Sequence, residues 1–196
     1  MNYPRTAPPT GGPIQEPVNH RRSAPPSKRP APLLCLLLAA VLSALAGVVG
    51  SVIVYNGGKD LANSNVKDVI NEHPAELGVP SNLSASSLKQ FSGPMWDSLI
   101  DDRYDTLTAR AGFAVFTAVL LLVSVLFARN AAVWARVLLT LSAIVALITH
   151  SLVVRDYEPA SVTGLSWISI VSALAVLVLC WLPANNRFAR ARKAAR

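Results

Sequence analysis

The sequence predicts an all-α membrane protein with four transmembrane helices and a small helical extracytoplasmic cap between the first and the second. Of its 196 residues, 52% are apolar and only 15% are charged, a balance typical of membrane proteins. Four apolar blocks contain no Asp, Glu, Lys or Arg, and each is long enough, at about 1.5 Å per residue, to cross a hydrocarbon core of roughly 30 Å. In hydrocarbon every backbone amide must be satisfied within its own segment, so the blocks are predicted to be helices. They comprise residues 33–55, 111–128, 137–154 and 164–182.

Basic and acidic residues are divided unequally between the two sides of the predicted membrane. The two tails and the connector after the second block hold 12 basic residues and 1 acidic residue, a net charge of +11. Residues 56–110 and the connector after the third block hold 6 basic and 10 acidic residues, a net charge of −4. Because basic residues near span ends are retained in the cytoplasm, we expect a multi-pass protein of the cell membrane with both termini cytoplasmic and residues 56–110 outside.

Residues 1–32 are predicted to form a disordered, proline-rich and basic cytoplasmic tail. They hold 9 of the 14 prolines and show no apolar periodicity. Such a composition cannot bury enough apolar surface to offset the entropy of ordering. A solvated spacer is one interpretation, and a docking site for a proline-binding groove is the other. Nucleic-acid binding is not expected, because no aromatic residues interleave with the basic ones.

The first span, residues 33–55, is predicted to be an uncleaved anchor, because its apolar run continues well beyond a plausible signal-peptide cleavage site. Ser43, Gly47 and Ser51 recur every four residues within it. Small residues at this spacing let two helix backbones approach closely. We therefore expect them to form a helix-packing face. This face could pack against another helix of the same chain or against a second copy, and the sequence does not distinguish the two.

Residues 56–110 are predicted to be an extracytoplasmic helical segment. A turn at Gly57 and Gly58 should end the first span, and a short amphipathic helix should then run from Lys59 to about His73, closed by Pro74. Ser84 is positioned to cap a second short helix. Ser92 is expected to cap a third, which continues without a break into the second span. This third helix would stand well outside the bilayer.

The helix after Ser92 has two distinct sides. Its apolar side consists of Met95, Trp96, Leu99, Ile100, Tyr104 and Leu107. This side is too large to leave in water, so we expect it to pack against Leu61, Ile70, Leu88 and Phe91 and to complete a small cap. The opposite side carries Asp97, Asp101, Asp102 and Asp105, our candidate interaction face. A solvated acidic face and weak binding of a cation or a basic partner are the two interpretations; calcium-loop spacing and histidine are absent, so no metal site is expected.

The second and third spans, 111–128 and 137–154, should form a tight hairpin with Arg129 and Arg136 facing the cytoplasmic headgroups. The third span contains His150, a candidate functional residue because ionisable groups inside membranes are uncommon. It lies one turn from the outer end, where water reaches, and no span supplies a buried carboxylate to it. We therefore expect an interfacial or packed histidine, with pH sensing or cation relay as the alternative. The fourth span, 164–182, is followed by a basic cytoplasmic tail, 183–196.

A resemblance to known membrane proteins lies in two short stretches at the predicted cytoplasmic edge, from Trp134 to Leu139 and from Trp181 to Phe188. With these stretches and its four-span plan, the chain resembles small uncharacterised four-span membrane proteins of high-GC Gram-positive (actinobacterial) bacteria. The resemblance implies no known activity.

The four spans and the long outer segment together favour a non-enzymatic interaction or accessory protein of the cell envelope. Its outer cap would bind a membrane or envelope protein, while the spans contact the lipid bilayer. The alternative is a small transporter or channel subunit, although the spans lack the buried acids and paired Gly/Pro interruptions that mark substrate paths. No catalytic cluster and no cofactor are expected, because His, Cys, Asp and Glu do not occur at ligand or nucleophile spacing.

Overall fold

The structure is a computed structural model that describes residues 31–75, 79–80, 82–129, 133–185, 187 and 190. The described residues form helices and contain no strand. The helices are α1 (Ala31–Glu72), α2 (Ala85–Ala128), α3 (Val133–Arg155) and α4 (Ala160–Cys180). All four are long and apolar enough to cross a membrane. The expected disordered tail up to residue 30 and most of the basic tail after residue 185 lie outside the described residues.

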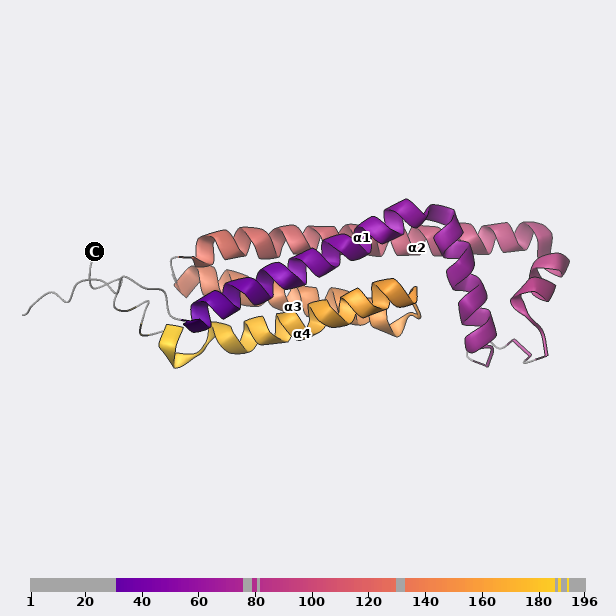
Figure 1. Cartoon of the computed structure of the whole chain (residues 1–196). Coiled ribbons are helices and arrows are strands. Elements are labelled where there is room, and N and C mark those ends of the chain that lie inside the picture. Colours follow the sequence, from indigo (N-terminus) through magenta and orange to yellow (C-terminus); the bar gives the residue numbers. More distant parts are fainter. Residues whose placement is uncertain are drawn as a thin grey trace, which may run out of the picture.

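The four helices form an elongated bundle in which each helix packs against the next along the chain, and α4 closes the ring against α1 (Figure 1). Small residues line the contacts: Ala40, Ala118, Ala143 and Ala173 are at most 2% exposed. Because lipid offers no hydrophobic drive for helix association, such close backbone packing is what holds spans together. Along the bundle, the outward surfaces of the four helices carry many exposed large apolar residues, as a lipid-facing bundle requires.

Two glycines bend the long helices at one end of the bundle. Gly58 has φ 52° and ψ −142°, and Gly93 has φ 35° and ψ −109°. These torsions are readily available only to glycine. At the predicted turn of Gly57 and Gly58, α1 is kinked at Gly58, where two helical pieces meet. Ser84 caps α2 as expected, accepting a hydrogen bond from the Ser87 amide at 3.3 Å.

The kinks divide this end into three pieces, which we call together the cap. The arm, residues 59–72, crosses the end of the bundle, and the extension, residues 94–110, continues α2 straight beyond it (Figure 1). The hook, residues 85–92, is the first part of α2 and turns back from the extension. The expectation that Ser92 caps the extension is wrong, because its hydroxyl donates backward to the Leu88 carbonyl at 2.6 Å.

Candidate functional site

The connector between α3 and α4 is clamped to both long helices by charged and polar side chains. Arg103 on the extension donates through Nη1 to the Asp156 carboxylate and through Nη2 to the Asp156 carbonyl, both at 2.8 Å. Its Nε donates to Oδ1 of Asn65 on the arm at 2.8 Å, and Asn65 Nδ2 donates to the Tyr157 carbonyl at 2.9 Å. Just beyond the arm, the ring of His73 lies against that of Tyr157, with centroids 4.3 Å apart. One arginine thus ties together the arm, the extension and the connector.

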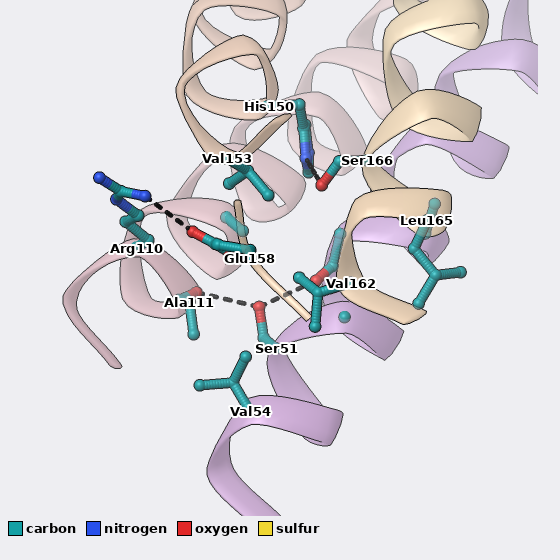
Figure 2. Close-up of a pocket in the computed structure, with 14 residues that line it drawn as sticks. Ser51, Val54, Arg110, Ala111, His150, Val153, Glu158, Val162, Leu165 and Ser166 are labelled. Carbon is teal, nitrogen blue, oxygen red and sulfur yellow. Dashed lines mark hydrogen bonds and ion pairs between the residues drawn. The ribbon is translucent and has the colours of Figure 1, made fainter. Parts of the chain in front are cut away.

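A second arginine joins this clamp to the interior of the bundle. Nη1 of Arg110 lies 2.6 Å from Asp156 Oδ2. The same nitrogen lies 3.0 Å from Glu158 Oε1 (Figure 2). The side chain of Glu158 is only 2% exposed. Burial raises the pKa of the Glu158 carboxyl, and the hydrogen bond and positive charge of Arg110 partly oppose that rise. Glu158 is therefore a buried carboxyl group at the edge of the apolar bundle that is directly paired with Arg110.

Behind Glu158 lies a small, mainly apolar cavity of about 20 Å³, which we call the inner cavity (Figure 2). His150 points into it from α3 and shares a hydrogen bond between Nδ1 and Ser166 Oγ at 3.2 Å. Ser51 Oγ lies 2.8 Å from the Gly47 carbonyl and 3.0 Å from the Ala111 carbonyl. Its volume is about that of one water molecule. All four helices and the connector contribute to its wall.

The small-residue face predicted on the first span is buried within the chain. Ser43 Oγ lies 2.8 Å from Ser169 Oγ on α4, and Ser51 contacts α2 through Ala111. A β-carbon at Gly47 would lie 3.4 Å from His150 Nε2. The three residues therefore face three different neighbouring helices, so this face is occupied inside a single copy.

His150 is a packed histidine, which is one of the two environments expected for it. The side chain is not interfacial, because the residue is 5% exposed and lies among all four helices. The carboxylate that the spans lack comes from the connector, where Glu158 lines the same cavity. The sequence carried one usable signal, an acidic residue directly before Pro159 in a connector of only a few residues. A short connector cannot reach far from the bundle end, which keeps Glu158 close to the ends of the helices.

The acidic face lies on the solvent side of the extension. Asp97, Asp101, Asp102 and Asp105 are all exposed. Only Asp101 forms an ion pair, with Lys59 on the arm at 2.5 Å, and this contact raises the lysine pKa. No group of three or more His, Cys, Asp or Glu suited to a metal ion occurs among the described residues. These carboxylates do not converge on a point.

A second, larger cavity lies within the cap, and we call it the cap cavity. It has a volume of about 720 Å³. Its lining is mainly apolar, and Arg110 and Asp156 at the bundle end also border it. The apolar lining residues are Val66, Val69, Ile70, Val79, Leu88, Met95, Trp96 and Leu99. Its volume is in the range of about 300–1,000 Å³ that is typical of small-molecule sites.

The expected packing of the cap is only partly correct. Trp96, Ile100 and Leu107 are buried against the arm residues Val66 and Ile70. However, three apolar residues that we expected to be covered are exposed, which we call the apolar ridge: Phe91 (83%), Met95 (75%) and Leu99 (44%). The break at Gly93 turns the hook away from the line of the extension, so the hook does not cover this side.

Replacing Glu158 by glutamine is expected to weaken the pH dependence of stability. Because burial raises the folded pKa of this carboxyl, the folded chain holds the proton more tightly than the unfolded chain. The contribution of Glu158 to the free energy of unfolding is thus largest at low pH. It is lost as pH rises from the ordinary glutamate pKa of about 4.3 through the higher folded value.

Thermal unfolding in detergent between about pH 4 and pH 7 measures this dependence. The slope should be smaller in Glu158→Gln than in the unaltered chain. The exposed Asp97→Asn variant is the matched control and should keep the original slope. Identical slopes in all three proteins would contradict the prediction.

The described residues thus contain two adjoining sites, a water-sized inner cavity with His150 and Glu158 and a larger apolar cap cavity. Arg110 lines both. Comparison with models of protein families, with curated proteins and with solved structures finds no match to this chain.

Proposed function

We propose that this chain is a non-enzymatic interaction or accessory protein of the cell envelope, which binds another membrane or envelope component through its cap. The excess of basic residues in the tails supports an extracytoplasmic position for the cap. The cap cavity and the apolar ridge together form the binding site. The four apolar helices serve as the membrane anchor.

The observation that carries this proposal is an exposed apolar surface on α2, far along the helix from the predicted second span. Met95 precedes the predicted start of the second span at residue 111 by sixteen residues, or about 24 Å of straight helix. The headgroup layer adds only about 5–8 Å on each side of the hydrocarbon. Lipid in the plane of the membrane therefore cannot cover Met95, which is 75% exposed. Large exposed apolar patches in water mark binding sites.

Site-specific photocrosslinking in native membranes tests the proposal. A photoreactive residue placed at Met95 or Leu99 should give one dominant adduct with another component. The same residue at Asp97, on the acidic face of the same helix, is the matched control and should not give that adduct. If none of the three positions gives an adduct, or if all three give the same mixture, the proposal is wrong.

A second candidate function, a small transporter or channel subunit, draws support from the inner cavity. Buried ionisable residues in a membrane bundle often mark ion or proton paths, and His150 and Glu158 line one cavity. The volume of the cavity is only about that of one water, so proton transfer fits it better than passage of a solute. A pH-sensitive dye inside liposomes distinguishes this candidate. It requires a proton flux that His150→Phe abolishes.

A further inference from the structure

We infer that the cap cavity binds the acyl chain of a phospholipid drawn from the surrounding bilayer. This inference rests on the proposed function, since it names the membrane component that the cap receives. Three observations carry it. Most polar groups in the cavity wall already make hydrogen bonds, the wall is continuous with the lipid-facing surface of α2, and the cavity begins near the ends of the spans.

Most polar side chains that line the cap cavity are hydrogen-bonded to each other, to the arm or to their own helix, and the carboxylate of Asp102 is exposed at the edge of the wall. Ser92 donates to the Leu88 carbonyl at 2.6 Å, and Thr106 donates to the Asp102 carbonyl at 3.0 Å. All three nitrogens of the Arg103 guanidinium group are bonded, as described for the clamp. A peptide segment would need partners for its backbone amides and carbonyls, and this wall offers few. A hydrocarbon chain needs none.

The wall of the cap cavity continues directly into the lipid-facing surface of α2. Leu99 and Thr106 line the cavity and lie seven residues apart, about two helical turns. Phe113 follows at the same spacing, and it is 65% exposed within the apolar span. The three side chains therefore lie along one face of a straight helix. An acyl chain leaving the bilayer beside Phe113 can follow this face into the cavity and remain against protein.

The position of the cavity also suits such a ligand. Its bundle end is bordered by Arg110 and Tyr157, next to the ends of the spans, and its far end by Leu88 and Met95. A chain that enters from the membrane thus meets charged and aromatic groups first and apolar groups last. This order matches an amphiphile whose polar part stays near the headgroup layer and whose tail extends into the cap.

The test uses the full chain in vesicles of phosphatidylethanolamine and phosphatidylglycerol that contain a phosphatidylcholine with a diazirine at the far end of one acyl chain. After irradiation, adducts are mapped by peptide mass spectrometry. We expect adducts on cap peptides that contain residues 66–70 and 88–99, as well as on the spans. Adducts on the peptide with Phe113 serve as the internal standard.

Met95→Asp introduces a charge at a residue that is already 75% exposed, so folding of the cap does not depend on it. We expect cap adducts to fall by about tenfold relative to the Phe113 standard, because a charge in the apolar wall opposes a hydrocarbon chain. Ser98→Asp is the matched control, since Ser98 is exposed and outside the cavity wall, and it should leave the ratio unchanged.

The outcomes separate this inference from the proposed function. If lipid adducts are confined to the spans, or if both variants lower the cap adducts equally, the acyl-chain inference is wrong. If in addition a residue at Met95 captures one protein in native membranes, the proposed function stands with a protein as the partner. If neither lipid nor protein is captured at the cap, both fail.

Discussion

Replacing Gly47 by leucine is expected to lower the stability of the bundle by about 3 kcal/mol, because it overpacks a closely packed contact. A β-carbon at Gly47 would already lie 3.4 Å from His150 Nε2 and 3.6 Å from the Ala114 carbonyl. The further atoms of leucine would have to displace the histidine ring or separate α1 from α2. Either movement disrupts the wall of the inner cavity.

Thermal unfolding in detergent measures the effect, with an expected fall in midpoint of roughly 5–10 °C. Gly164→Leu is the matched control, because a β-carbon there has nothing within 4 Å. Gly47→Ala adds only the β-carbon and should fall between the two. If Gly47→Leu were no less stable than Gly164→Leu, the close approach of α1 to His150 would be wrong.

Replacing Arg103 by alanine is expected to release the arm from the end of the bundle. The guanidinium donates to Asn65, to the Asp156 carboxylate and to two connector carbonyls, and its side chain is only 15% exposed. Hydrogen bonds to charged groups contribute about 1.5–3 kcal/mol each, but Asp156 is partly exposed and keeps Arg110. We therefore expect a local cost of about 2–4 kcal/mol that is confined to the cap.

Hydrogen–deuterium exchange in detergent distinguishes this local opening from global unfolding. Amides of the arm, residues 59–72, should exchange about 30- to 1,000-fold faster in Arg103→Ala, as the expected free-energy cost implies. Amides of the four spans should keep their original rates. Arg155→Ala removes an exposed arginine beside the connector and should change neither. Equal protection of the arm in both variants would contradict the clamp.

The four apolar helices could be predicted from the sequence because the absence of charge over long blocks is a local property. Hydrocarbon excludes unpaired charges, so composition alone predicts where such helices fall. Composition gave a wrong prediction where a charged side chain is buried because it has a partner distant in sequence. Arg136 was predicted to face the headgroups, yet it is 2% exposed and donates to the Asn185 carbonyl. A cation can be buried when a partner lies next to it, and the partner here is 49 residues away.

The candidate site was harder to predict for the same reason. His150 could be singled out as an ionisable residue in an apolar block, but its neighbour in the inner cavity comes from a different element. Glu158 is brought beside it only when the connector folds over the bundle end. The exposed apolar ridge was also missed, because helical periodicity describes which residues share a face and not whether another helix covers that face. The break at Gly93 decides that question.

The two glycine torsions have a consequence for how the overall shape of this molecule arises. Without the break at Gly58, a 42-residue α1 would be a straight rod of about 63 Å that continues beside the extension of α2. The chain would then end in a slender two-helix stalk with no interior. The cap cavity instead depends on bending at positions 58 and 93, because most other residues around it are helical. The backbone torsions of these two glycines thus decide whether this end of the protein contains a cavity or forms a two-helix stalk.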